Sequence, residues 1–212
     1  MKPLEQMLRV AGHAGAIETK VESPPEPRGI ALVCHPHPLF GGTNQNKVVH
    51  TLASTFIQLG YAVLRPNFRG VGASEGLHDD GRGETEDMLL VLDEARHIFG
   101  ELPVVLAGFS FGAYVQTRVA ASLADAGQPA QRLVLVGTAT GHVEGARHYS
   151  TRAVPKDTLV IHGSADTTVS LANVLAWAEP LELPVVVIPG ADHFFHRRLH
   201  LIRDVILRAW PH

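Results

Sequence analysis

The chain has 212 residues, a length that suits one globular domain of ordinary size. Its 18 Lys and Arg residues against 21 Asp and Glu residues give a net charge of −3, which argues against a nucleic-acid-binding or membrane-surface protein, because such proteins carry an excess of basic residues. Hydrophobic residues make up 45% of the chain, so it is not intrinsically disordered, and no apolar run approaches the ~18 residues of a membrane span.

The cysteine content and the N-terminus predict a cellular compartment. The single cysteine, Cys34, cannot form an internal disulfide, and the segment from Met1 to Gly15 lacks the apolar core of a secretory signal peptide. No repeat, low-complexity tract or linker divides the chain. We therefore expect a single soluble, cytoplasmic domain over residues 1–212. The sequence leaves the oligomeric state open between a monomer and a homodimer.

The predicted strands begin with a weakly alternating edge strand that extends to about Val21 and is followed by the proline-rich segment 23–27. The later strands are short, unalternated, β-branched runs, which are typical of parallel strands buried on both faces. These runs are residues 30–34, 61–64, 104–107, 133–136, 159–161 and 185–188.

Segments with helical spacing separate these runs, at residues 48–59, 84–99, 113–126, 171–178 and 195–210. Strands that alternate with helices predict repeated βαβ units. The expected fold class is therefore α/β, a three-layer αβα sandwich around a mostly parallel sheet. Ligands of such sheets bind beyond the carboxyl ends of the strands, so the residues after each run are where catalytic side chains are expected.

The run 104–107 is followed by Gly108-Phe109-Ser110-Phe111-Gly112 and then by a helical pattern, which is the strand–turn–helix context of a nucleophile. Glycines two positions either side of Ser110 allow the sharp turn that projects its hydroxyl above the sheet. The free amide of Phe111, at the helix N-terminus, is the predicted first donor to an oxyanion. The alternative, a serine that only caps the helix, is disfavoured by this context.

A serine nucleophile needs a base and an acid that orients the base, and in this architecture they follow in the order Ser, Asp, His. Asp166 follows the run 159–161 and is the predicted acid, and His193 follows the run 185–188 and is the predicted base. Asp192 is a competing acid, but the side chains of neighbouring residues cannot easily face each other. His162 is a competing base, but it ends the strand before the acid and is expected to pack or hydrogen-bond within that loop.

Two other residue groups have alternative readings. His193, His196 and His200 share a helical spacing that could suggest a metal site, but His196 and His200 belong to a charged amphipathic helix, and a solvated face is favoured. We predict no metal and no cofactor. Cys34, in an apolar strand, is predicted to be inert filler, and Arg69 is predicted to have a structural role.

Two further stretches, Cys34-His-Pro-His-Pro-Leu-Phe-Gly-Gly42 and Asn67-Phe-Arg-Gly-Val-Gly-Ala-Ser-Glu-Gly76, complete a resemblance to a known family. From Ile30 to its end, the chain resembles the α/β-hydrolase fold serine hydrolases, in particular the small, lid-less, dienelactone-hydrolase-like or esterase-like subgroup. Dienelactone hydrolases have cysteine at the position of Ser110, and this departure favours general ester chemistry.

The loop after the run 30–34 is expected to supply the second oxyanion donor. Proline has no N–H, so His37 and Leu39 are the candidates, and the sequence does not decide between them. Residues 137–158, between two predicted strands, leave no room for a lid domain. We therefore expect an open site in which aromatic side chains contact the substrate, namely Phe40, Phe111, Phe194 and Phe195.

The sequence thus predicts a serine hydrolase that cleaves short-chain carboxylic esters or thioesters of small molecules through an acyl-enzyme intermediate. One alternative is a serine exopeptidase or amidase, disfavoured because no obvious acidic cluster could hold an α-amino group. A second is a non-catalytic binding scaffold, disfavoured because Ser110, Asp166 and His193 are all present. A nucleotide-binding protein is disfavoured because no glycine-rich phosphate loop follows the run 30–34.

Overall fold

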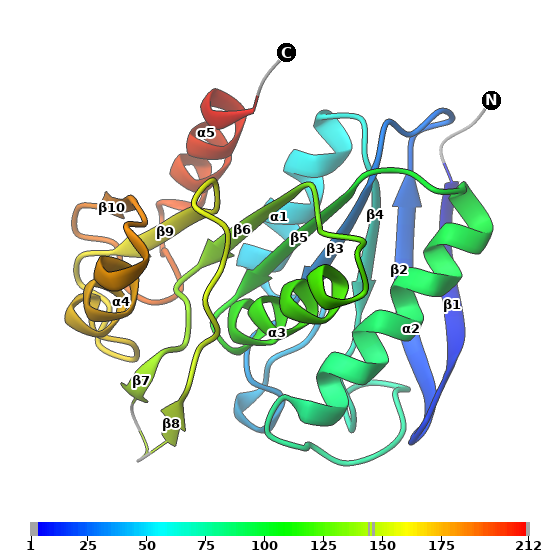
Figure 1. Ribbon diagram of the computed structural model, residues 1–212, viewed down its shortest axis with the longest axis horizontal. Helices are drawn as coiled ribbons and strands as arrows, with labels where there is room; N and C mark the ends of the chain where they lie inside the picture. Colours follow the sequence, from blue (N-terminus) through cyan, green and yellow to red (C-terminus); the bar gives the residue numbers. More distant parts are fainter. Residues whose placement is uncertain (1–3, 144, 146, 211–212) are drawn as a thin grey trace.

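The computed structural model describes residues 4–143, 145 and 147–210. Its middle layer is an eight-stranded sheet of order β1-β2-β4-β3-β5-β6-β9-β10 (Figure 1). From β4 to β10 neighbouring strands are parallel, whereas β1 and β2 are antiparallel. The strands are β1 (Leu4–Gly12), β2 (Gly15–Ser23), β3 (Ile30–Cys34), β4 (Ala62–Pro66), β5 (Val104–Phe109), β6 (Arg132–Val136), β9 (Leu159–Gly163) and β10 (Val185–Ile188).

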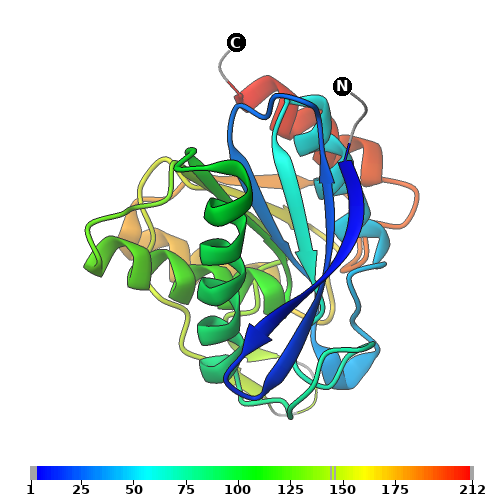
Figure 2. The ribbon, with the colours of Figure 1, turned by 90° about the vertical axis from the view of Figure 1, so that its right-hand side faces the viewer.

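Helices cover both faces of this sheet (Figure 2). α2 (Arg82–Phe99), α3 (Phe111–Asp125) and α4 (Leu171–Ala178) pack on one face, and α1 (Lys47–Gln58) and α5 (Leu199–Ala209) pack on the other. β3 shows why its sequence reads as a continuous apolar run. Ile30, Leu32 and Cys34 belong to one core cluster, while Ala31 and Val33 belong to the other. Both faces of β3 are therefore buried, as expected for a strand between two layers of helices. The predicted three-layer α/β fold is confirmed.

The N-terminal segment differs from the single edge strand that the sequence predicts. β1 and β2 form an antiparallel hairpin in the register Leu4↔Ser23 to Gly12↔Gly15, and β1 is the edge. In β1 the inward-facing positions include a polar residue, Gln6, between Leu4 and Leu8. The sequence therefore lacks the regular alternation of apolar and polar residues that identifies a half-buried strand.

The last helix begins later than residue 195, where the periodicity places it. Phe195 and Arg197 have φ angles of 54° and 60°, in the left-handed region, which is incompatible with an α-helix. The carboxylate of Asp192 accepts the amide of His196 at 3.0 Å, and this local hydrogen bond competes with helix formation. α5 therefore starts at Leu199, and the preceding residues form turns.

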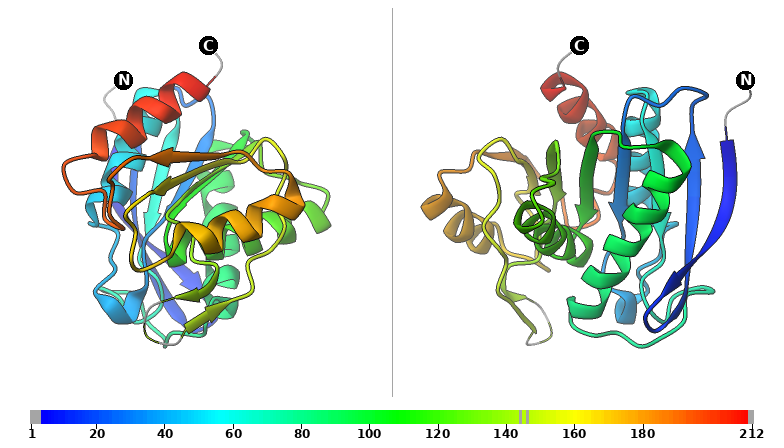
Figure 3. Two further views of the ribbon diagram at one scale, coloured as in Figure 1. Left: turned by 90° about the vertical axis from the view of Figure 1, so that its left-hand side faces the viewer. Right: turned by 45° about the vertical axis from the view of Figure 1, so that its right-hand side comes forward.

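The segment between β6 and β9 contains a short hairpin of β7 (Gly141–Val143) and β8 (Arg147–Tyr149). In the part of this segment that the structure describes there is no helix. The hairpin projects at the end of the molecule opposite both chain termini, as the two views in Figure 3 show. Because neighbouring strands from β4 to β10 are parallel, their carboxyl ends lie along one edge of the twisted sheet, and the hairpin follows the carboxyl end of β6 at this edge, where ligands bind in such sheets.

Two single-turn 3₁₀ helices complete the elements, η1 (Pro38–Phe40) after β3 and η2 (Glu179–Leu181) after α4. α1 is capped by the side chain of Asn46, whose oxygen accepts the amides of Val48 and Val49. Within the described residues, none of the helices combines the length and the apolar character needed to traverse a lipid bilayer.

Candidate active site

Ser110 stands at the turn between β5 and α3, with φ 57° and ψ −117°. For a residue other than glycine this is a strained conformation, of the kind that persists only where the surroundings enforce it. A Cβ atom at Gly108 would lie 2.5 Å from the backbone carbon of Gly112, and a Cβ atom at Gly112 would lie 2.5 Å from the carbonyl oxygen of His35. Neither position tolerates a side chain, so the two glycines are what allow the turn to close around Ser110.

Ser110, His193 and Asp166 form a connected chain of hydrogen bonds. His193 Nε2 lies 3.0 Å from Ser110 Oγ, and His193 Nδ1 lies 2.7 Å from Asp166 Oδ2. The other carboxylate oxygen of Asp166 accepts the amides of Thr168 and Val169 at 2.9 and 2.8 Å. Because Asp166 accepts the Nδ1 proton, Nε2 is the unprotonated nitrogen of a neutral His193. This arrangement has the geometry of a catalytic triad and can accept the hydroxyl proton of Ser110.

The competing acid and base occupy other positions. Asp192 pairs with His196 Nδ1 at 2.6 Å on the surface, and the hydrogen bond from His196 lowers the pKa of Asp192. His162 is fully buried, and its Nε2 lies 3.0 Å from the carbonyl oxygen of Val169 and 3.5 Å from Asp166 Oδ2. Burial lowers the pKa of His162, which favours the neutral ring. His162 thus bonds within the loop of the acid, as the sequence predicts.

His193, His196 and His200 do not converge. His193 is engaged by Ser110 and Asp166, whereas His196 is engaged by Asp192, and His200 is exposed. Across the described residues, no group of three or more His, Cys, Asp and Glu side chains is arranged to hold a metal ion.

The loop after β3 contains both candidates for the second oxyanion donor. The amide of Leu39 donates to the Nδ1 atom of its neighbour's ring, His37, at 3.2 Å. The carbonyl oxygen of His37 accepts the amides of Phe40 and Gly42 at 3.2 and 3.0 Å, which closes the loop tightly. Among the described residues, neither the amide of His37 nor that of Phe111 donates to a protein acceptor.

His35 is buried behind this loop, and both of its ring nitrogens contact the backbone. Nε2 accepts the amide of Phe68 at 2.9 Å, and Nδ1 donates to the carbonyl oxygen of Pro36 at 2.6 Å. A doubly protonated ring would direct an N–H at the Phe68 amide. Burial lowers the pKa of His35 to about 4, from an ordinary value of 6.5. The neutral ring is therefore part of the native structure.

This pKa predicts a pH-dependent stability. As the pH falls below 6.5 the unfolded chain binds a proton at residue 35, whereas the native state binds it only near pH 4. The free energy of unfolding should therefore decrease between these pH values, by up to about 1.4 kcal/mol per pH unit from this residue. Urea unfolding at a series of pH values, for the wild type and for His35→Gln, measures it. Equal pH slopes for the two proteins would contradict the assignment.

Two side chains near the site have contacts that agree with their predicted roles. Arg69 holds Asp87 of α2 through two hydrogen bonds, of 2.6 and 3.0 Å, and these bonds raise the pKa of Arg69. Cys34 is fully buried, with Gln116 Nε2 3.2 Å from its Sγ, and burial raises the pKa of the thiol. Thiolates are the reactive form of cysteine, so Cys34 is inert in the native fold.

A cavity of about 190 Å³ opens above Ser110 and His193. Phe40 and Phe194, two of the predicted contact residues, line it and are exposed. The expectation for the side chains of Phe111 and Phe195 is wrong, because they are 1% and 0% exposed and belong to the two core clusters. The remaining lining residues are Pro36, His37, Gly41, Gly42, Asn46, Arg147 and Thr168.

Arg147 is the lining residue that sequence reasoning missed. It begins β8, and its guanidinium carbon lies 4.1 Å from the centre of the Phe40 ring. No local motif surrounds it, and its place beside Ser110 depends on the path of the β7–β8 hairpin. The sequence therefore contains no pattern that could have identified Arg147, and only the folded structure reveals its position.

The comparisons with known proteins agree with this fold and geometry. A family model described as "Serine aminopeptidase, S33" matches residues 25–154. An α/β serine hydrolase homologue from Coxiella burnetii is 37% identical, with a TM-score of 0.84 over 100% of this chain and 99% of that chain. An α/β serine hydrolase without a lid, from Xanthomonas campestris, is 34% identical, with a TM-score of 0.84 over 99% of this chain and 94% of that chain.

A dienelactone hydrolase from Anabaena variabilis, at 19% identity, shares the fold, with a TM-score of 0.74 over 98% of this chain and 97% of that chain. The predicted resemblance is thereby confirmed. The chain belongs to the family described as serine aminopeptidase S33 and is a lid-less serine hydrolase of the α/β-hydrolase fold.

Proposed function

We propose that this protein hydrolyses short-chain carboxylic esters or thioesters through an acyl-enzyme intermediate on Ser110. The observation that carries the proposal is the unbroken chain of hydrogen bonds from Ser110 Oγ through His193 to Asp166. With the Nδ1 proton of His193 donated to Asp166, Nε2 faces the hydroxyl proton of Ser110 that it must accept for nucleophilic attack. The cavity above Ser110 is small, which favours a short acyl chain.

In the first half of the reaction, Ser110 Oγ attacks the carbonyl carbon while His193 Nε2 takes the hydroxyl proton. The carbonyl oxygen becomes an oxyanion and is stabilised by the amide of Phe111 and by a second amide. We assign the second amide to His37, because the Leu39 amide already donates to the His37 ring. Loss of one such donor typically costs on the order of 100-fold to 1000-fold in turnover.

The intermediate then expels the alkoxide or thiolate, which takes the proton from His193. In the second half, a water molecule attacks the acyl carbon while His193 accepts one of its protons. The second intermediate collapses, the proton returns to Ser110, and the carboxylic acid leaves. Asp166 holds His193 in the required tautomer and stabilises the imidazolium that forms in each half.

An aminopeptidase activity is the alternative that the family description favours. An aminopeptidase needs an acidic group near the nucleophile to bind the α-ammonium group. The residues that line the cavity directly above Ser110 include a cation, Arg147, and no Asp or Glu, and the exposed carboxylate of Asp80 lines only the adjoining cavity. This charge favours an ester over an N-terminal amino acid.

The test is hydrolysis of p-nitrophenyl esters from acetate to dodecanoate beside aminoacyl p-nitroanilides, together with labelling by a fluorophosphonate. We expect the highest kcat/KM for the short esters, little hydrolysis of the anilides, and a mass increase on the peptide that contains Ser110. Preferred cleavage of the anilides would make the aminopeptidase the correct function. No hydrolysis and no label would indicate a non-catalytic scaffold.

A further inference from the structure

A second and larger cavity, of about 380 Å³, adjoins the cavity above Ser110. The two cavities share three lining residues, His37, Phe40 and Arg147. A substrate whose carbonyl carbon is at Ser110 can therefore extend past these side chains into the second cavity. The second cavity has the size of an ordinary small-molecule site.

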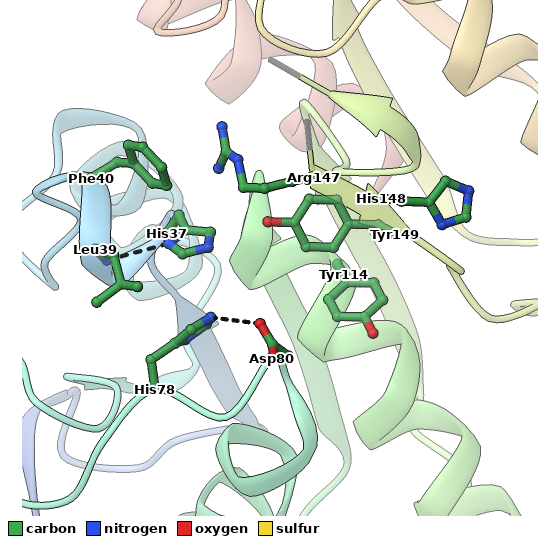
Figure 4. A pocket seen from close by; sticks show the side chains of 9 residues that line it. All are labelled: His37, Leu39, Phe40, His78, Asp80, Tyr114, Arg147, His148 and Tyr149. Carbon is green, nitrogen blue, oxygen red and sulfur yellow. Dashed lines mark hydrogen bonds and ion pairs between the residues drawn. The ribbon is translucent and has the colours of Figure 1, made fainter. Parts of the chain in front are cut away.

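Rings form most of the walls of this cavity (Figure 4). On one side the ring of His37 lies 4.6 Å from that of His78 and 4.9 Å from that of Phe40. On the other side the rings of Tyr149 and Tyr114 are 5.0 Å apart. These contacts lie in the range of favourable aromatic pairs, and they hold the walls in place before any ligand binds. A flat ring would find aromatic surface on both sides.

Polar groups occupy the ends of the space. Figure 4 shows Arg147 near Phe40 and Asp80 beside His78, with the hydroxyl of Tyr149 directed into the cavity. Asp80 Oδ1 lies 3.3 Å from His78 Nε2, and the Asp80 side chain is 92% exposed, so it can still accept a hydrogen bond from a ligand. Burial raises the pKa of Tyr149, which keeps its hydroxyl protonated and able to donate.

His37 adds a donor of fixed orientation. Its Nδ1 accepts the Leu39 amide, so the proton of the neutral ring is on Nε2. Burial lowers the pKa of His37 to about 4, which keeps the ring neutral near pH 7. An aliphatic chain would fill the same space but would match none of these polar groups, whereas an aromatic ring with a hydroxyl offers a π-face to the walls and a donor to Asp80.

We propose that this cavity is a subsite for a hydroxyl-bearing aromatic ring in the substrate whose ester is cleaved at Ser110. The proposal rests on the proposed esterase function and names its substrate class. The walls recognise the ring, and Asp80 recognises the hydroxyl. Arg147 and Phe40, which border both cavities, direct the ring toward the second cavity and the ester toward Ser110.

The test compares ethyl esters of hydroxyphenylpropanoate, phenylpropanoate and cyclohexylpropanoate, with ethyl butanoate as the small reference. A second series has the same rings in the alcohol half of an acetate ester. In the series that places the ring in the cavity, kcat/KM for the hydroxyphenyl ester should exceed that for the cyclohexyl ester about tenfold. Because the ratio compares two esters in one protein, a uniform loss of activity does not affect it.

Four variants locate the preference. Phe40→Leu and Tyr149→Leu should each lower the ratio toward one, whereas Tyr149→Phe should retain most of it. Phe40 is 66% exposed, so its variant reports even where a change at the buried Tyr149 impairs folding. Asp80→Asn should abolish only the preference for hydroxyphenyl over phenyl, and asparagine suits the left-handed φ of 50° at this position. Leu77→Ala, in the same exposed loop but outside the cavity lining, is the matched control.

Two results would overturn the subsite. One is a ratio near one in both series while ethyl butanoate is cleaved and a fluorophosphonate labels Ser110, so that the esterase stands without the subsite. The other is a tenfold ratio that survives both Phe40→Leu and Tyr149→Leu, which would place the ring elsewhere. Absence of both labelling and hydrolysis would refute the esterase and, with it, the subsite.

Discussion

Ser110→Ala is expected to lower kcat for p-nitrophenyl acetate by about a million-fold. The variant has no oxygen to form the acyl-enzyme, and His193 has no hydroxyl from which to take a proton. Any residual hydrolysis would come from the oxyanion donors and substrate binding alone. The measurement is pre-steady-state release of p-nitrophenol, in which the wild type should show a burst equal to the enzyme concentration and the variant none.

Ser54→Ala is the matched control for this change. Ser54 is an exposed serine in α1, whose hydroxyl bonds the carbonyl oxygen of Thr51 in its own helix. The burst and kcat of this variant should equal those of the wild type. A full burst in Ser110→Ala would show that another residue forms the covalent intermediate, and the proposed mechanism would be wrong.

The second large effect is expected for Asp166→Asn, with a loss of about 10⁴-fold in kcat. An amide at this position can still accept the amides of Thr168 and Val169, so the loop should keep its shape. The amide no longer holds the proton on His193 Nδ1, and the ring can adopt the tautomer that directs an N–H at Ser110. It also no longer stabilises the imidazolium with a negative charge.

Asp192→Asn tests the same chemistry at the neighbouring carboxylate. The carboxylate of Asp192 bonds the ring of His196 on the surface rather than that of His193, so kcat of its variant should stay within about threefold of the wild-type value, because exposed side-chain pairs contribute little energy. Both variants require thermal unfolding curves, which should match the wild type within a few degrees. Full activity of Asp166→Asn, or an equal loss in Asp192→Asn, would reassign the acid.

The features that the sequence predicts well are those with a local cause. β3 and β5 are buried on both faces, and each strand therefore appears in the sequence as a continuous run of apolar residues. The turn at Ser110 is equally local, because Gly108 and Gly112 are required by atoms within the turn and in the adjoining loop. The order of the later strands then places Asp166 and His193 at the same edge of the sheet.

The features that the sequence does not predict depend on distant partners. β1 is a strand because it pairs with β2, although its inward face includes Gln6. The β7–β8 hairpin is short, and its residues have no periodicity that would separate them from a loop. Arg147 reaches the cavities only because of this hairpin. The choice between His37 and Leu39 depends on one hydrogen bond within the loop, which no residue pattern reports.

The burial of Cys34 has a practical consequence for measuring the dynamics of the fold. The thiol lies at the end of a central strand, next to the turn of Ser110, and it is inaccessible to reagents in the native state. An alkylating reagent can reach it only when the middle of the sheet opens. The rate of alkylation therefore gives the free energy of that opening, as hydrogen exchange does for an amide. Cys34 is therefore a native probe of the opening of the sheet, at the strand next to the one that carries Ser110.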